Sequence, residues 1–305
     1  MAVMTITLVP MFWCEVRGVT EMREHPALRN TPDMPQVADL WIAVVMALGI
    51  IAVRYVLVRA LEPVSRAILP PHLRDSAFRI DRLATSLFNA FYFSWVSIVG
   101  YIILKNEEWF PASLGGSGDF DQAFKVFDIV PTSSAKLYVL LQLAYQIHNL
   151  IYVLLLKPLD NDVMDFVVHD FTAILLIGSS YLTNYYAIGA TIGFLNDACD
   201  IAMFTFSVST DSERKPVIAV MTLTILVVWG YTRLYVYPLE ILSGVFTESP
   251  KDNPNLSPLF FWLMRIMLSF LLVLQTWWLV LFAEKGRRKL LRPTVTTQLK
   301  QIVRV

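Results

Sequence analysis

The stretch LFFWLMRIMLSFLLVLQTWWLVLF, residues 259–282, contains a single charged side chain, Arg265. A helix needs about 20 mostly apolar residues to cross a bilayer, so this stretch predicts a membrane-spanning helix. Residues 40–60, LWIAVVMALGIIAVRYVLVRA, predict another. The whole chain of 305 residues agrees, with 56% hydrophobic residues, 16% charged residues and a mean hydropathy of +0.55. This composition indicates a polytopic membrane protein and excludes a disordered chain.

Seven apolar stretches are long enough to span the membrane. They are residues 40–60, 85–104, 136–156, 164–182, 187–207, 217–237 and 259–282. Only a few residues around Thr183 and Asn184 separate the fourth stretch from the fifth, which predicts a tight helical hairpin. Lipid cannot satisfy backbone polar groups, and the sequence shows no alternating barrel pattern, so we expect an all-α bundle of about seven transmembrane helices.

The connecting loops alternate in charge. Residues 54–82 and the tail from Lys285 are basic and residues 211–216 carry Arg214 and Lys215, whereas residues 106–131 and 239–257 are acidic. The positive-inside rule then predicts a lumenal N-terminus and a cytosolic C-terminus. Lys+Arg and Asp+Glu are both 25, and there are two Cys, which excludes a nucleic-acid binder relying on net positive charge and a disulfide scaffold.

Ionisable residues inside predicted spans are costly in lipid and mark candidate functional sites. Around the start of the fourth span, Asp162, Asp165 and His169 follow at intervals of three and four, so they line one helical face. Asp170 is rotated by about 100° from His169 and is expected to point elsewhere. Asp162 has an equally good explanation as a carboxylate at a helix N-terminus.

The fifth span carries Asp197 and Asp200 on a shared face. A hairpin would bring this face beside His169 within the bundle. Carboxylates around one imidazole suit proton transfer or activation of a nucleophile, and a purely structural network is the alternative. His148 stands alone in the third span and is expected to be packed or hydrogen-bonded. Two arginines near predicted span ends, Arg233 and Arg265, are expected to snorkel.

These residues resemble a known family. Lys157-Pro158, followed by Asp162, Asp165 and His169, is similar to the segment that enters the Lag motif of ceramide synthases, which belong to the TLC (TRAM–Lag–CLN) family. The family's later Asp-x-x-Asp is matched by Asp197-Ala198-Cys199-Asp200. Further matches occur in the family's order over residues 80–285: Trp109-Phe110, Thr232-Arg233-Leu234, Tyr237-Pro238, and Gln275 with Trp278.

The resemblance implies transfer of a fatty acyl group from acyl-CoA to the amine of a sphingoid base. His169 would be the general base or the acyl-accepting nucleophile. Asp165, Asp197 and Asp200 would polarise it or hold the amine, and Asp170 stands at the family's second motif histidine with its role open.

Substrate-binding roles are expected for Asp162 and, by charge, for Arg214 and Lys215, with the Arg287-Arg288-Lys289 cluster as a further candidate for the CoA phosphates. The positive-inside rule explains the same cations equally well. Acyl-CoA is expected as a co-substrate, with no cofactor. A metal site from His169 and the nearby aspartates is chemically feasible, but nothing in the spacing requires one.

Two departures bear on activity. Asp170 replaces the second histidine, and Phe204 stands where ceramide synthases carry an acidic residue. The alternative function is therefore a non-catalytic, lipid-sensing or regulatory partner of an active synthase. A seven-span receptor fits the span count, but the third span lacks an Asp-Arg-Tyr-like triplet and the seventh lacks Asn-Pro-x-x-Tyr.

The expected organisation has four parts: a lumenal segment over residues 1–38, a first transmembrane helix over 39–61, a TLC-like six-helix domain over 78–290 and a basic cytosolic tail over 291–305. No convincing signal peptide opens the chain, and Asn255 begins a glycosylation sequon in a predicted lumenal loop. The resemblance implies the endoplasmic reticulum membrane, with lipid, acyl-CoA and sphingoid base as partners and no nucleic acid. It leaves open a homo- or hetero-dimer with another family member.

Overall fold

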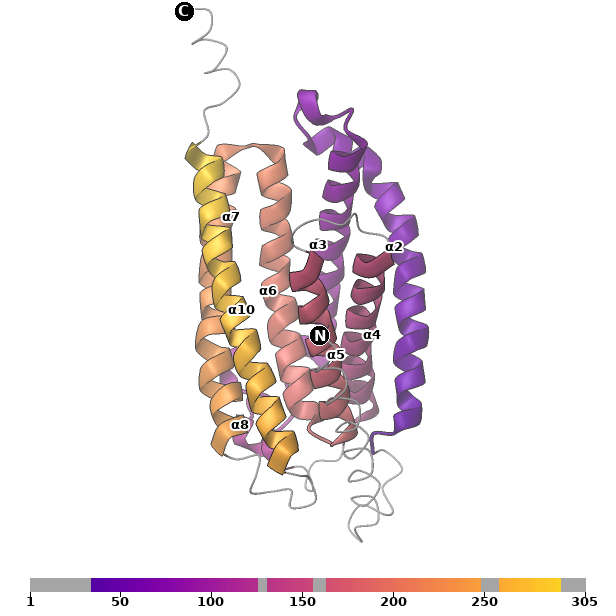
Figure 1. The fold of residues 1–305 in the computed structure, drawn as a ribbon, viewed down its shortest axis with the longest axis vertical. Helices are drawn as coiled ribbons and strands as arrows, with labels where there is room; N and C mark the ends of the chain where they lie inside the picture. The colour runs from indigo at the N-terminus through magenta and orange to yellow at the C-terminus, as the bar shows by residue number, and fades with distance from the viewer. Residues whose placement is uncertain (1–33, 126–130, 156–162, 248–257, 292–305) are drawn as a thin grey trace, which may run out of the picture.

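A computed structural model gives the fold and describes residues 34–125, 131–155, 163–247 and 258–291. These residues form a bundle of long helices that run along one axis (Figure 1). They are α2 (Leu40–Ile68), α3 (Ala77–Leu104), α4 (Ser133–Leu155), α5 (Val163–Leu182), α6 (Tyr186–Ser212), α7 (Lys215–Trp229), α8 (Ser243–Thr247) and α10 (Pro258–Leu291). The predicted all-α polytopic class is confirmed.

Six helical stretches in the described part of the chain are long and apolar enough to cross a membrane: Val37–Ile68, Ala77–Leu104, Ser133–Leu155, Tyr186–Ser212, Lys215–Thr247 and Pro258–Leu291. The fourth predicted span is a shorter apolar helix, Phe166–Leu182. The segment before residue 34, the sequon at Asn255 and the tail beyond Leu291 lie outside the described residues.

The predicted hairpin between α5 and α6 is confirmed. Asn184 turns the chain with a φ of 62°, a left-handed conformation that asparagine tolerates better than most residues. The hydroxyl of Thr183 donates a hydrogen bond to the carbonyl of Ser179 at 2.7 Å and so closes the end of α5. The turn therefore sets the two polar helices side by side and antiparallel.

The predicted end of the sixth span at Tyr237 is wrong. After α7 the chain continues as a π-helical segment, η5 (Gly230–Leu242), and then as α8, so one rod runs from Lys215 to Thr247. Pro238 lies inside η5. Proline normally ends an α-helix because it lacks an N–H and clashes with the preceding turn, but a π-helix is wider and shifts the bonding pattern to i→i+5.

Helix α6 lies at the centre of the bundle and packs against α3, α4, α5, α7 and η5. By contrast, α2 and α10 present large apolar side chains outward, among them Trp41, Val56, Trp262 and Val273. An outer surface of this kind suits contact with lipid tails. The polar residues of α6 are thus enclosed by protein, while the outer helices face the membrane.

One end of the bundle is basic. Figure 1 shows the α2–α3 turn, the α6–α7 turn and the C-terminal end of α10 together at its upper end. Arg79 and Arg82 of α3 lie 3.5 Å and 3.6 Å from the carboxylate of Asp211 at the end of α6. Lys289 of α10 donates a hydrogen bond to the carbonyl of Thr210 at 3.1 Å. We call this the basic end.

The opposite end is closed by the loop after α3. Trp109 and Phe110 are buried, and the Trp109 ring meets the Tyr186 ring edge-on with centroids 5.9 Å apart. A short helix, η4 (Phe120–Phe124), packs against α6 and α8. Burial raises the pKa of the Glu107 carboxyl in this loop, which accepts a hydrogen bond from the Thr132 hydroxyl at 3.2 Å. The acidic loop is therefore part of the packed fold.

Helix α3 approaches α4 closely at Gly100. A Cβ there would lie 2.7 Å from Cε2 of the buried Tyr138, whereas a Cβ at Gly49 of α2 would meet no atom within 4 Å. We expect Gly100→Ala to lower the free energy of unfolding by about 1–3 kcal/mol through overpacking. The control Gly49→Ala should leave it unchanged or raise it by up to about 1 kcal/mol. Equilibrium unfolding in mixed SDS–detergent micelles measures both, and equal effects would contradict this packing.

Candidate active site

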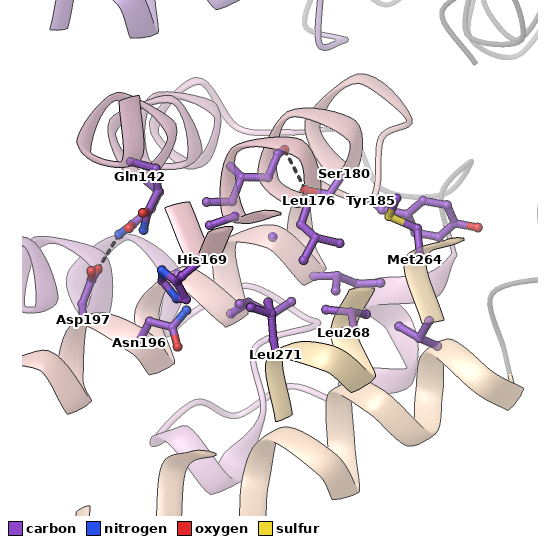
Figure 2. A pocket seen from close by; sticks show the side chains of 18 of the residues that line it. Gln142, His169, Leu176, Ser180, Tyr185, Asn196, Asp197, Met264, Leu268 and Leu271 are labelled. Carbon is purple, nitrogen blue, oxygen red and sulfur yellow. Dashed lines mark hydrogen bonds between the residues drawn. The ribbon is translucent and has the colours of Figure 1, made fainter. Parts of the chain in front are cut away.

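A cavity of about 970 Å³, its open mouth included, lies between α4, α5, α6 and α10. Figure 2 shows that its two ends differ in polarity. The polar side chains of Gln142, His169, Asn196 and Asp197 lie at one end, and Tyr185, Met264 and Leu268 lie toward the other. Apolar side chains make most of the long wall: Leu176, Ile177, Ile188, Phe260, Phe261, Met264, Leu268 and Leu271. The cavity thus offers a polar compartment joined to a hydrocarbon-lined one.

His169 lies in the polar compartment and is held by its neighbour in sequence. Its Nδ1 is 3.1 Å from Oδ1 of Asp170, whose Oδ2 accepts a hydrogen bond from Nδ2 of Asn149 on α4 at 2.7 Å. The imidazole ring also packs against Trp278 of α10, with centroids 5.2 Å apart. If Nδ1 carries the proton toward the carboxylate, Nε2 is left as a base.

The expectation that Asp170 points away from His169 is wrong. Asp170 does turn toward α4, where it meets Asn149 and is almost fully buried. Its other oxygen, Oδ1, nevertheless lies 3.1 Å from Nδ1 of His169. Among the described carboxylates, Asp170 is therefore the one in direct contact with the imidazole.

The two carboxylates of α6 both line the cavity, as their shared face predicts. Oδ2 of Asp197 accepts hydrogen bonds from the Tyr138 hydroxyl at 2.9 Å and from Nε2 of Gln142, the dashed contact in Figure 2. Oδ1 of Asp200 accepts one from Nη2 of Arg233 at 2.7 Å. Asp197 is thus held by neutral donors, and Asp200 by a cation.

Arg233 lies inside the bundle, which corrects the expectation that it snorkels. It is 2% exposed, and its guanidinium lies 4.4 Å from the centre of the Trp229 ring. Trp229 in turn donates a hydrogen bond to the backbone carbonyl of Gln275 at 3.0 Å. His148, by contrast, is buried beside Nη1 of Arg54 at 3.3 Å, so its expected packed role is confirmed.

Several predicted site residues are not in this cluster. Lys157 and Asp162 lie outside the described residues, and so does the side chain of Asp165 within α5. Arg214 and Lys215 lie at the basic end, at the start of α7, and do not line the cavity. Between Asp200 and the end of α6 at Ser212, the helix rises by roughly 18 Å at 1.5 Å per residue. Arg214 and Lys215 therefore lie about that far from Asp200 along the helix axis.

The TLC domain family model matches residues 82–284, about two thirds of the chain and the whole of this site. The chain belongs to the TLC-domain family. Proteins named as ceramide synthases are among its relatives. The chain is 24% identical to the ceramide synthase hyl-2 of Caenorhabditis elegans over 266 residues, 80% of this chain and 77% of the relative. It is 28% identical to the ceramide synthase LOH2 of Arabidopsis thaliana over 255 residues, 79% of this chain and 84% of the relative.

In this TLC-domain protein, the structure shows the contacts of Asp170 and Phe204, the two residues at which the sequence resemblance implies a departure from the ceramide synthase pattern. Asp170 is a bonded partner of His169. Phe204 stacks on Phe93, a cavity-lining residue, with centroids 5.6 Å apart and planes within 8° of parallel. An aromatic ring thus packs behind this part of the cavity wall.

Sequence reasoning missed the polar stripe of α4 that supports the TLC-domain site. Tyr138, Gln142, Tyr145 and Asn149 follow at intervals of four, three and four, and so line one helical face. Three of them bond Asp197 or Asp170. The same periodicity is a usable sequence signal, because polar side chains in a span face the bundle interior. Within the described residues, no three His, Cys, Asp or Glu side chains gather as a metal site would need.

Proposed function

We propose that this protein transfers a fatty acyl group from acyl-CoA to the amine of a sphingoid base, forming a ceramide. The observation that carries the proposal is the His169–Asp170 pair beside a cavity with a polar end and a long apolar wall. Such a cavity suits substrates with one reactive head and long hydrocarbon tails. The relatives named as ceramide synthases support the same reaction class.

His169 acts as the general base in this proposal. Asp170 holds the proton on Nδ1, so Nε2 accepts a proton from the neutral amine as its nitrogen attacks the thioester carbonyl. The new C–N bond forms, the C–S bond breaks, and His169 returns the proton to the departing CoA thiolate. Asp200 and Asp197, on the cavity wall, provide negative charge and acceptors that bind the incoming amine.

The basic end is the proposed docking site for the CoA phosphates. Arg214 and Lys215 lie there with Lys289 of α10. Their separation from the cavity, roughly 18 Å along α6, is comparable to the reach of the pantetheine arm. We propose that this end faces the cytosol, with the N-terminus lumenal, in the endoplasmic reticulum membrane.

The test is an acyl-transfer assay in membranes that lack endogenous ceramide synthase. Sphinganine is supplied with a panel of acyl-CoAs of different chain length, and ceramide is measured by mass spectrometry. We expect product from the wild type and a loss of at least about 10²-fold in His169→Ala, the scale of a lost general base. The variant's unfolding transition verifies its fold. No product from folded wild type at any chain length would overturn the proposal in favour of a non-catalytic family member.

A further inference from the structure

Two amide side chains on the cavity wall present oxygens that accept no hydrogen bond from the described residues. Gln275 of α10 is 2% exposed, and its Oε1 is buried and unpartnered. The Oδ1 of Asn196 on α6 is also buried and accepts no hydrogen bond from the described residues. Both residues line the cavity. Buried carbonyl oxygens normally have a donor, and leaving one without a partner is destabilising.

Both oxygens lie in or beside the polar compartment. Figure 2 shows Asn196 next to His169 and Asp197. Gln275 follows Leu268 and Leu271 at intervals of seven and four, so it extends the cavity-facing side of α10. The bond from Trp229 to its backbone carbonyl fixes that turn of the helix. The unpartnered oxygens are thus presented by two rigid helices.

The neighbouring carboxylates do not supply the missing donors. Asp197 and Asp200 are themselves acceptors: the Tyr138 hydroxyl and Gln142 Nε2 donate to Asp197, and Nη2 of Arg233, a residue outside the cavity lining, donates to Asp200. The described polar compartment therefore has acceptors to spare, which favours a ligand that brings several N–H and O–H groups. A plain long-chain amine brings only its nitrogen.

We propose that Gln275 and Asn196 accept hydrogen bonds from the hydroxyl groups of the acyl acceptor and so select an amino-alcohol head over a simple amine. This inference rests on the proposed acyl transfer. Asp200 would bind the amine and His169 would accept its proton, whereas the two amides would recognise the hydroxyls that flank it. Gln275 and Asn196 are then specificity-determining residues, and the reaction does not need them for its chemistry.

The test compares sphinganine with 1-deoxysphinganine and octadecylamine, using one acyl-CoA, in wild type, Gln275→Met and Asn196→Leu. Wild type should prefer sphinganine to octadecylamine in kcat/KM by at least about tenfold, because a site built to bond hydroxyls rejects analogues that lack them. Each variant should lower that preference about tenfold while its turnover of octadecylamine stays within about threefold of wild type. Thr276→Val is the matched control, since Thr276 is exposed on the same helix.

Two outcomes would overturn the inference: an unchanged preference in both variants, or an equal fall in turnover of all three amines. If the wild type acylates no amine at all, the proposed function fails separately. In that case a binding measurement tests the inference by itself: octadecylamine competes with radiolabelled sphinganine for the purified protein. The inference requires sphinganine to bind more tightly than octadecylamine, and each variant to remove most of the difference. Equal affinity in the wild type would reject it.

Discussion

Asp170→Asn is expected to lower the kcat of acyl transfer by about 10²-fold or more while the KM for both substrates stays near the wild-type value. The carboxylate of Asp170 lies 3.1 Å from Nδ1 of His169, and in the proposed mechanism it keeps the proton on that nitrogen and stabilises the imidazolium that forms. An amide of the same shape loses the charge and can present an N–H to the ring, favouring the wrong tautomer. The contact with Asn149 remains sterically feasible, so the fold should persist.

Matched variants separate this positioning role from a structural one. Asp121→Asn, at an exposed site in η4 that does not line the cavity, should leave kcat unchanged. Asp170→His would restore the His-His pair that the sequence resemblance implies, and we expect it to retain far more activity than Asp170→Asn. An unchanged kcat in Asp170→Asn, measured beside an inactive His169→Ala, would show that the carboxylate only supports packing.

The helices could be predicted from sequence because the bilayer imposes their length and apolar character. Residues 259–282 lie within α10 and residues 40–60 within α2, and the turn at Thr183 and Asn184 is where the sequence places it. The end of the sixth span could not be predicted in the same way. Pro238 normally ends an α-helix. No feature of the local sequence predicts the π-helical segment that accommodates this proline.

That single error explains the misplacement of Arg233. A span ending at Tyr237 puts Arg233 one turn from the membrane surface, where a long cation can reach water. In the structure the rod continues to Thr247, so Arg233 lies deep in the bundle and needs an anion there. Asp200, near the middle of the neighbouring helix α6, provides it.

The sequence could predict which helix faces form the candidate site, but it could not predict the contacts between their side chains. The shared face of Asp197 and Asp200, and its approach to His169, follow from the helical period and the hairpin. The contact between His169 and Asp170 does not follow, because neighbours in a helix diverge unless a third element draws both toward one gap. Asp170 is bonded by Asn149 of α4 and His169 packs against Trp278 of α10, so the contact depends on packing between helices that no local pattern encodes.

Removing Arg233 should destabilise the bundle more than overpacking it at Gly100 does. Arg233→Met leaves the part-buried carboxylate of Asp200 without its cation, and breaking a buried ion pair from one side costs up to about 3–5 kcal/mol. It also removes the stacking of the guanidinium on Trp229. Equilibrium unfolding in mixed SDS–detergent micelles, followed by tryptophan fluorescence, measures the loss.

A double variant distinguishes the stranded charge from lost packing. Asp200→Asn with Arg233→Met removes the charge that Arg233→Met leaves behind, so it should be more stable than Arg233→Met alone, with a coupling energy of about 1–3 kcal/mol. Arg265→Met is the matched control. Arg265 also lies in a predicted span, but it donates to the backbone carbonyls of Val245 and Phe246, at 3.3 Å and 3.0 Å, so its loss should cost only about 1 kcal/mol. Equal losses in Arg233→Met and Arg265→Met, with no coupling to Asp200→Asn, would mean that the Arg233–Asp200 pair does not hold α6 to the rod.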